Sequence, residues 1–596
     1  MRWVMMGLAM MACMVASGQP AGGDEDIMRF LGTESPEEVD EEDAGFLSSL
    51  LSRPLKINRA SPSRLVSSGI FSRYQALSLA DYRQRHGDVL SLMELSLVDG
   101  FGMPFAERIA PFISFDSALR PGQSPEAKMR PRTDITIRGG LKHNSSLIWG
   151  SALKAHVESG RRLDVSLGLS SPYGHFEADR LTYTTSVIWN MEKVPCEILF
   201  GDFNARFGQG LILRNGISMS TLSSPYSLMK NPAGLSGTSS FTGASAFTGA
   251  GCETSFRNFT LAGFLALPGI KEYKSFKDDL MVMPAFNLSW FSRYGQVGLT
   301  HYAVSACRLR PDPEESGMWS SLDTRWCLNG CDLFAEAAYD WKTSCPAALA
   351  GVIFPLGSHA RMAVAARWYP ELFKPYAAGA YGSGTMPSNE YGVTLSSEAG
   401  NGRTGTGSHR IVLTADAAHF PKPKKDDRGG SMQLKGQLVW EWKPLSFLNV
   451  KTRLVERIRT WGILSRTDVR TDLVADFGSF NVSVRLNALN CSGWGLLSYI
   501  EGGYKARDLS VCLRQGFFRI DDWQDRIYVY ERDAPGTFNV PAYYGRGLWT
   551  AMAGSVRFSG WGRIYVRAAY TAYPFMPPET RKPGRAELKV QSVFSF

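Results

Sequence analysis

The main pattern of this sequence is an alternation of apolar and polar positions that begins near residue 132 and continues to the C-terminus. It is clearest in the stretches 163–169, 480–488 and 564–570, whose apolar positions are Leu163, Val165, Leu167, Leu169, Phe480, Val482, Val484, Leu486, Ala488, Ile564, Val566, Ala568 and Tyr570. A period of two is typical of β-strands with one apolar face. Residues 132–596 are therefore predicted to form a β domain.

Two architectures fit so long an alternation: a soluble β protein, whose apolar faces meet in a core, and a membrane barrel, whose apolar face meets lipid. The predicted strands are about ten residues long, the length that crosses a bilayer at a tilt. Polar connections such as 398–408 and 421–430 resemble extracellular loops, and no propeller-like repeat appears. The last strand carries Phe594 and Phe596, which resembles the assembly signal of outer-membrane barrels. The sequence therefore predicts a transmembrane antiparallel β-barrel over 132–596, with about 14–18 strands.

The N-terminus has the pattern of a secretory signal peptide over residues 1–18. Arg2 precedes an apolar run, and small residues at 16–18 precede the expected cleavage site. Residues 19–50 form an acidic leader that we expect to end in a short helix. Beyond the signal, no apolar window of the sequence is long enough for a transmembrane helix. The exported chain is therefore expected either to be soluble or to cross a membrane as strands.

Residues 51–116 change to helical periodicity, and residues 117–131 form a linker that contains Pro, Gly and Ser. Gly87 is placed to end one helix. Ser91 and Glu94 have the spacing of a capping box at the start of the next helix. The region is predicted to be a small all-α domain ahead of the barrel.

This region, over residues 55–113, resembles the tandem helix-hairpin-helix domain of the competence protein ComEA family. The resemblance rests on the entry around Ile57 and Asn58, on Tyr82 and Arg83 in the middle, and on a second hairpin that ends in Gly100-Phe101-Gly102. In that family the hairpins present backbone N–H groups to a DNA phosphate, which glycine permits by close approach and positive φ. The resemblance implies DNA phosphate-binding roles for Gly100, Phe101, Gly102, Gly69, Ile70 and Arg73. In the first hairpin, Phe71 stands where the family has its second glycine.

The charge of this region leaves two interpretations open. Its Lys and Arg residues are balanced by nearby Asp and Glu residues, whereas a non-specific DNA binder is usually more basic. The net charge of +9 is spread over the whole chain, so it indicates no dedicated nucleic-acid surface. The domain is expected either to bind DNA or to dock against a protein partner or the barrel mouth.

The combination of this domain with a barrel resembles a group of exported helix-hairpin-helix proteins of Gram-negative bacteria. The segments 201–211 and 525–531 look like an early and a late barrel motif of this group. Their polar residues are expected to line the lumen in structural or pore-lining roles, namely Asp202, Arg206, Gln209, Arg526 and Glu531.

Catalytic chemistry has no support in the sequence. It contains no zinc-protease, serine-hydrolase or phosphate-loop motif, and its eight histidines are scattered. We therefore expect no enzyme activity, no cofactor and no metal site. Eight cysteines follow the signal, and we expect one or two local disulfides in loops rather than metal binding.

These expectations combine into an outer-membrane β-barrel whose helix-hairpin-helix domain lies in the periplasm. Its partners are outer-membrane lipid and either DNA or another envelope protein. The first function hypothesis is non-specific DNA binding in DNA uptake or handling. The alternative is an envelope transport or scaffold barrel whose domain docks a protein partner or the barrel mouth.

Overall fold

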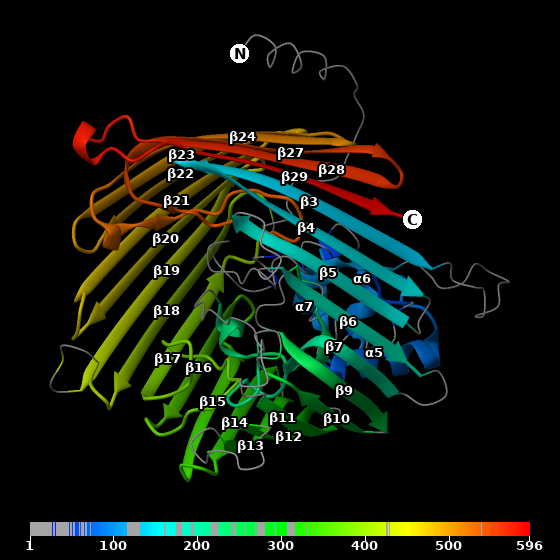
Figure 1. Ribbon diagram of the computed structural model, residues 1–596. Helices are drawn as coiled ribbons and strands as arrows, with labels where there is room; N and C mark the ends of the chain where they lie inside the picture. Colours follow the sequence, from blue (N-terminus) through cyan, green and yellow to red (C-terminus); the bar gives the residue numbers. More distant parts are fainter. Residues whose placement is uncertain are drawn as a thin grey trace.

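A computed structural model shows a closed β-barrel with a small helical module (Figure 1). It describes residues 27, 30, 47, 50, 51, 54–58, 60, 65, 68, 70, 71, 73–115, 131–159, 163–174, 181–191, 196–215, 224–238, 240, 241, 246–256, 258–268, 270, 281–292, 294–306, 316–328, 330–403, 405–424, 427, 430–537 and 539–596. The described strands form a ring of 24 antiparallel members, closed by pairing of the last strand with the first. The predicted mainly-β fold, with a barrel after a small helical region, is confirmed.

In chain order, the ring consists of β3 (Arg132–Asn144), β4 (Ser146–Ser159), β5 (Leu163–Gly174), β6 (Thr182–Asn190), β7 (Cys196–Arg206), β9 (Phe247–Phe256), β10 (Phe259–Ala266), β11 (Met281–Phe291), β12 (Gly295–Ala306), β13 (Gly317–Leu328), β14 (Cys331–Asp340), β15 (Cys345–Pro355), β16 (Ala360–Tyr369), β17 (Glu390–Gly400), β18 (Ser408–Phe420), β19 (Ser431–Leu445), β20 (Leu448–Arg459), β21 (Ser465–Asp476), β22 (Phe480–Asn490), β23 (Trp494–Lys505), β24 (Leu509–Ile520), β27 (Gly545–Ser559), β28 (Gly562–Ala572) and β29 (Arg585–Ser595). A short strand, β8 (Gly234–Gly237), also pairs with β7.

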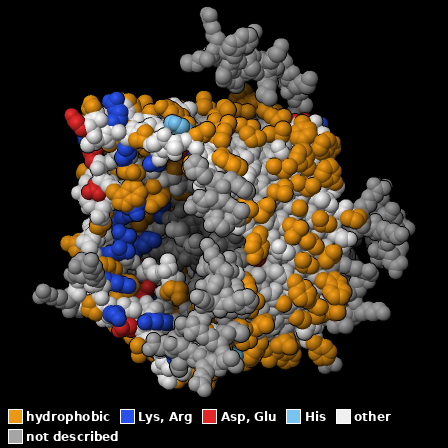
Figure 2. All heavy atoms as spheres, in the orientation of Figure 1, with side chains coloured by type: hydrophobic (Ala, Val, Ile, Leu, Met, Phe, Trp, Pro, Cys, Tyr) orange, Lys and Arg blue, Asp and Glu red, His pale blue; other side chains and the backbone are white. Residues whose placement is uncertain are grey.

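The outer and inner faces of the ring differ in polarity, as the alternation in the sequence requires. In β18, Ile411 and Leu413 are 45% and 55% exposed on the outside, whereas Val412 between them is 1% exposed. Thr414 and Asp416 are buried on the same inner face as Val412. Figure 2 shows apolar side chains spread over the outer surface at the right of the view. So large an exposed apolar surface is unfavourable in water but suits contact with lipid.

The expected number of 14–18 strands is wrong, because many connections are shorter than the sequence pattern suggested. Ser145 alone, at φ +74°, separates β3 from β4. Two residues each, 446–447 and 560–561, separate β19 from β20 and β27 from β28. Short turns leave more of the chain for strands, so the same length makes 24 of them.

The two ends of the barrel are unequal. The chain enters and leaves at one end, where the connections are short, such as 446–447, 477–479 and 506–508. At the other end the connections are long, as between β16 and β17 and between β24 and β27. Bacterial outer-membrane barrels have short periplasmic turns and long extracellular loops. This asymmetry distinguishes the end of the barrel with short turns of the periplasmic kind from the end with long loops of the extracellular kind.

Aromatic rings gather at the short-turn end. Trp561 stacks on Phe594 and Phe596, with centroids 5.9 Å apart in both pairs. Phe447 stacks on Phe477 at 5.2 Å, between two neighbouring short turns. Such rings suit the interface between lipid and water. The terminal Phe596 also exchanges two backbone hydrogen bonds with Thr133, at 2.9 and 3.2 Å, so the end of the chain is held against the first strand.

The helical module precedes the barrel and contains α5 (Arg73–His86), α6 (Leu92–Leu97), α7 (Gly102–Ile109) and the 3-10 turn η2 (Ala110–Phe112). Its ends are tied by a parallel pair of short strands, β1 (Leu55–Lys56) and β2 (Ile113–Ser114). Ile27, Leu47 and Leu50 lie in its apolar core, so residues of the expected leader take part in it. None of the helices among the described residues has the length and hydropathy of a transmembrane helix.

Two local predictions for this module are confirmed. Ser91 is the N-cap of α6, and its hydroxyl accepts a hydrogen bond from the Glu94 N–H at 3.2 Å. The Glu94 carboxylate in turn accepts from the N–H of Leu90, the residue before the N-cap, at 2.8 Å, which is one residue away from the reciprocal bond of a standard capping box. Gly87, at φ +90°, follows the end of α5 and donates to the Arg83 carbonyl.

Candidate functional site

The residues proposed for DNA binding are divided between the interior and the surface of the module: Ile70 and Phe101 are buried, and Gly100 and Gly102 are exposed. Ile70 is fully buried, and Phe101 packs on Phe71 with a centroid distance of 5.9 Å. Gly69 and the side chain of Arg73 lie outside the described residues. Of the six positions, Gly100 and Gly102 have the positive φ that the hairpin needs, +85° and +65°.

Gly100 has a packing reason that does not involve a ligand. A Cβ at this position would lie 2.6 Å from Cε1 of Tyr74. The Gly100 carbonyl accepts a hydrogen bond from Gln75 Nε2 at 2.8 Å. The Phe101 N–H donates to the Val98 carbonyl at 3.1 Å. Gly100 and the start of α7, at Gly102 and Met103, are exposed to solvent.

The lumen of the barrel is occupied in part by segments that fold inward from the long-loop end. Their described residues are 207–215 and 224–233 after β7, 370–389 between β16 and β17, and 521–537 and 539–544 between β24 and β27. Backbone bonds join the first two: Arg214 N–H donates to Ala377 at 2.7 Å, and Gly379 N–H donates to Gly210 at 2.9 Å. The first two segments therefore form one unit inside the barrel.

The early motif holds the first of these segments against the wall. Gly208 and Gly210, at φ +57° and +82°, turn the chain so that two backbone N–H groups face Glu336 of β14. The N–H groups of Gln209 and Leu211 donate to this carboxylate at 2.7 and 3.0 Å. The expected lumenal position of Gln209 is confirmed, since it is buried inside the ring. Asp202 is also buried, but it alternates along β7 with the inner-core residues Leu199 and Phe203, so it is buried within the wall. The role of Gln209 is to fix the segment.

The remaining polar groups of the early motif make local bonds. Asp202 accepts from the Thr185 N–H at 2.8 Å and from the hydroxyl of Thr248, so it joins β6, β7 and β9. Gln209 exchanges two hydrogen bonds with the backbone of Lys230. Arg206 ends β7 and pairs there with Gly234 of β8.

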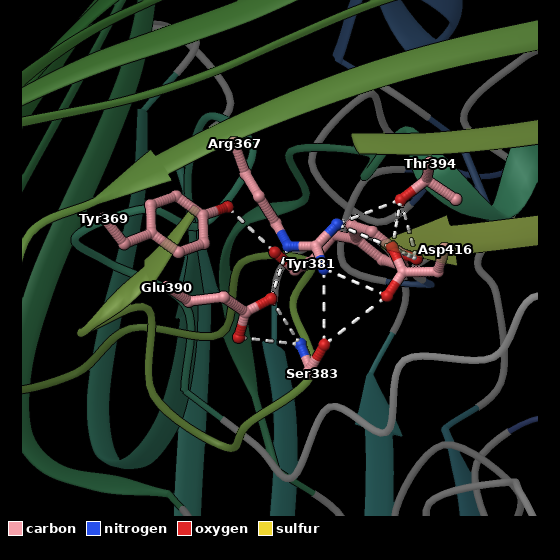
Figure 3. Close-up of polar contacts among 7 residues, drawn as sticks. All are labelled: Arg367, Tyr369, Tyr381, Ser383, Glu390, Thr394 and Asp416. Carbon is pink, nitrogen blue, oxygen red and sulfur yellow. Dashed lines mark hydrogen bonds and ion pairs between the residues drawn. The ribbon is translucent and has the colours of Figure 1, made fainter. Parts of the chain in front are cut away.

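The second segment is held by a buried ionic cluster, drawn in Figure 3. Arg367 of β16 donates two hydrogen bonds to Asp416 of β18, at 2.7 and 3.0 Å, and a third to Glu390 of β17. Glu390 also accepts from the Ser383 N–H at 2.9 Å. Tyr369 donates to the Tyr381 carbonyl at 2.8 Å. The cluster thus fastens residues 381–383 to three adjacent strands.

The third segment contains the late motif. It includes η7 (Trp523–Asp525), β25 (Ile527–Tyr528) and β26 (Ala542–Tyr543). Asp525 accepts from the N–H groups of Ser492 and Gly493 at 3.1 and 2.8 Å. Glu531 is buried and bonds Arg567, which also bonds Glu587 at 2.5 Å. Glu531 therefore lies in the lumen as expected.

Arg526 does not line the lumen as the sequence suggested. Its guanidinium lies 4.6 Å from the ring of Trp523 and donates to Tyr528 OH at 2.8 Å, and this hydrogen bond is exposed to solvent. The expectation failed because the alternation of strands does not apply to the turn η7, in which Asp525 is the buried residue. Arg138 of β3 instead reaches the segment, through the Gly536 carbonyl at 3.3 Å.

Tyr226 connects the first segment to the helical module. It lies in η4 (Pro225–Leu228), and its hydroxyl accepts a hydrogen bond from Arg361 at 2.8 Å. Arg361 is the second residue of β16, which begins at the short-turn end. Arg108 of α7 lies 5.0 Å from the centroid of the same ring. Burial raises the pKa of the Tyr226 phenol, so it remains neutral in this contact.

This contact places the module at the end of the barrel where the turns are short. Figure 1 shows α5, α6 and α7 behind β5 to β7, inside the outline of the ring. Residues 207–215 follow β7 at the opposite end. Residues 224–233 contact the module through Tyr226.

The cysteines and metal-binding side chains give no separate site. The seven cysteines that the structure describes are free, and six of them lie in strands: Cys196, Cys252, Cys327, Cys331, Cys345 and Cys512. The expected loop disulfides are therefore not present among them, since a barrel of short turns places these positions in strands. Over the same described ranges, no three His, Cys, Asp or Glu side chains converge as metal ligands.

Comparisons with known proteins find similarity only at the level of structure. Neither a protein-family model nor a curated protein matches the sequence. The chain is similar to Pseudomonas aeruginosa OpdK with vanillate, at 8% identity and a TM-score of 0.29, over 78% of this chain and 98% of OpdK. It is similar to the siderophore receptor PirA of Pseudomonas aeruginosa, at 8% identity and a TM-score of 0.39, over 78% and 80% of the two chains. It is also similar to the copper transporter OprC, at 9% identity and a TM-score of 0.40, over 78% of this chain and 80% of OprC.

The closed ring, its apolar outer face and its aromatic rings define the class of this protein. It is a transmembrane β-barrel of the outer-membrane type. Within that class its particular feature is a lumen that contains three segments of its own chain, one of which contacts an N-terminal helical module through Tyr226.

Proposed function

We propose that this protein is a gated transport barrel of the bacterial outer membrane, in which the N-terminal module closes the periplasmic mouth. The contact of Arg108 and Arg361 with one tyrosine, Tyr226, carries this proposal. It connects the module to the wall through a segment that begins at the long-loop end. A change at that end can therefore reach the module directly, as a gate requires.

The buried anchors of the lumen also favour a gate over a permanently filled core. The segments 207–233 and 370–389 are fixed at Glu336 and at Arg367. The joint at Tyr226 is of a different kind, because a cation–π contact contributes only about 0.5–2 kcal/mol. A lumen with strong anchors and a weaker contact at Tyr226 is expected to open at that contact.

Conductance of the purified full-length protein in planar lipid bilayers tests this function. We expect low conductance for the native protein. Tyr226→Ala removes the ring that both arginines contact, so the open fraction is expected to rise about 5- to 30-fold, which corresponds to about 1–2 kcal/mol. Arg108→Ala is expected to give a similar increase, and the two changes together no more than either alone.

The matched control for this experiment is Tyr183→Ala, which removes an exposed tyrosine from β6. It is expected to leave conductance unchanged. A native protein that is already fully open, or a Tyr226→Ala protein that conducts no more than the native one, would show that the module does not close the barrel.

Non-specific DNA binding by a helix-hairpin-helix module is the second candidate function. The positive φ of Gly100 and Gly102 and the exposed start of α7 favour it. Against it, Arg108 is engaged with Tyr226, and the Phe101 N–H is used within the turn. The open question is whether the start of α7 receives a phosphate.

Met103→Glu tests this candidate without weakening the helix. A carboxylate in the first turn of α7 favours the helix dipole but repels a phosphate. If the hairpin binds DNA, the full-length protein binds a short duplex at low salt, and Met103→Glu lowers this affinity by about tenfold or more. Leu97→Glu, an exposed change on α6, is the control and leaves the affinity unchanged. Absence of binding at low salt, or equal binding by both variants, excludes DNA as the ligand of this hairpin.

A further inference from the structure

The inner face of strands β19 to β22 is strongly basic. Exposed Met432, Leu434 and Leu438 identify the outer face of β19, so its odd-numbered residues point inward. The registers of the next strands carry this face onward, because residues directly opposite each other share a face. Its charged residues are the basic Lys435, Lys443, Lys451, Arg453, Arg457, Arg459, Arg466, Arg470 and Arg485 and the acidic Glu441, Asp468, Asp472 and Asp476.

Like charges on this face stand directly opposite each other. Lys435 is opposite Arg457, and Arg457 is opposite Arg466, so three positive residues form one row across three strands. Arg453 and Arg470 form a second opposed pair. Like charges in directly opposite positions destabilise a sheet. An arrangement that costs stability twice on one face indicates a role other than folding.

The acidic residues of this face neutralise other groups. Asp472 bonds Arg470 and Arg485, at 2.9 and 2.6 Å. Asp468 accepts from Asn487 at 2.6 Å. Glu441 bonds Lys451 at 3.3 Å and Arg410 of β18 at 3.2 Å. Asp416 of β18 stands directly opposite Lys435 at one end of the row, whereas Arg457 and Arg466 stand opposite basic residues.

Arg457 is the centre of this row. Its Nε is buried and has no hydrogen-bond partner among the described residues. The positive charges of Arg459 and Arg466 both act on it. Arg459 donates to Gln433 at 2.6 Å and lies over the ring of Trp461. The row lies near the long-loop end, since β20 ends at Arg459.

This wall also borders open space. Figure 2 shows Lys and Arg side chains gathered beside a hollow at the left of the view, where Figure 1 places β19 to β21. The inward segments are anchored elsewhere, at Glu336 of β14, at Arg367 of β16 and at Arg567 of β28. A solute that passes the barrel would therefore meet the basic wall.

We propose that this basic face is the solute path of the barrel and that it selects anionic solutes bearing carboxylate or phosphate groups. The proposal rests on the transport function proposed above. Guanidinium groups bind both oxyanions through paired N–H donors, and rings or rows of Arg and Lys select anions in pores. Bound oxyanions would also relieve the repulsion within the row.

A binding experiment tests the anion site without requiring an open channel. The unfolding temperature of the detergent-solubilised full-length protein is measured with inorganic phosphate, succinate or chloride at equal ionic strength. Phosphate or succinate is expected to raise the unfolding temperature more than chloride does. In Arg457→Gln/Arg466→Gln the affinity for the oxyanion is expected to fall about tenfold or more, while the protein without oxyanion becomes more stable than the native one. The oxyanion with the larger effect identifies which of the two groups the wall prefers.

The control removes the same charge outside the lumen. Arg403→Gln/Arg507→Gln changes two exposed residues in short turns and is expected to alter neither the unfolding temperature nor the response to oxyanions. Equal stabilisation by all three anions, or an unchanged response in Arg457→Gln/Arg466→Gln, overturns the anion site.

The reversal potential in a KCl gradient then tests selectivity, in a Tyr226→Ala background. Anion selectivity is expected, and Arg457→Gln/Arg466→Gln is expected to shift it toward cations. Conductance without anion selectivity overturns this inference and leaves the transport function standing. If no variant conducts, the transport function fails, and the binding experiment still decides whether the wall is an anion site.

Discussion

Replacing Arg367 by methionine is expected to destabilise the barrel by about 3–5 kcal/mol. The side chain of Arg367 is 1% exposed and bonds two carboxylates, those of Asp416 and Glu390. Removing the cation leaves both carboxylates buried without their counter-charge, and a buried unpaired charge is far more costly than the loss of a surface ion pair. The segment 370–389 is expected to detach from the wall, because Ser383 is bonded to the same Glu390.

Two measurements check this result. The first is the temperature at which the barrel loses its compact migration on a denaturing gel, and the second is cleavage of residues 370–389 by protease. Arg410→Met is the matched control, since Arg410 also bonds two carboxylates but is one-third exposed, and a small effect is expected. Arg367→Met/Glu390→Gln/Asp416→Asn is expected to recover much of the stability. If Arg367→Met destabilises the barrel no more than Arg410→Met does, the cluster does not anchor the segment 370–389.

Gly201→Ala is expected to cost about 2–5 kcal/mol, although it adds only one methyl group. Gly201 has φ +95°, and a Cβ there would lie 2.0 Å from the backbone oxygen of Thr185. Backbone cannot move aside as a flexible side chain can. The unusual φ turns β7 so that Asp202 is buried next to Phe203, and the Asp202 carboxylate then receives the Thr185 N–H.

Two other glycines separate the contributions of space and of backbone angle. Gly139→Ala has open space and an ordinary φ, so little change is expected. Gly357→Ala has open space but φ +130°, so it reports the strain of the backbone alone. The unfolding temperature of the three variants is the measurement, and we expect Gly201→Ala to be the least stable. Equal stability of Gly201→Ala and Gly357→Ala would disprove the steric part of this argument.

The barrel could be predicted from the sequence because its two faces meet different surroundings. Lipid outside and a polar lumen inside impose a period of two on every strand, and β18 shows it at Ile411, Val412 and Leu413. The number of strands could not be predicted in the same way. It depends on how tightly each turn closes, and Ser145 alone connects two strands without any glycine or proline to mark the turn.

The lumen was only partly predictable, since its contacts join residues far apart in the sequence. Gln209 and Glu531 were recognised as lumenal from local motifs. Their partners were not, because Gln209 and Glu336 are brought together only by the register of the ring. The row through Arg457 and Arg466 was missed for the same reason, as neither residue belongs to a motif. Gly100 is the reverse case. It belongs to a recognised motif, but the sequence did not show that Tyr74 packs against it.

The pairing of β29 with β3 has a consequence for assembly. The ring closes between the first and the last strand of the barrel, so it cannot close before the whole chain has been exported. A chain that lost its final strand would keep two open edges, which lipid cannot satisfy with hydrogen bonds. Closure thus acts as a check on completeness, because only a full-length chain can enter the bilayer with every strand paired.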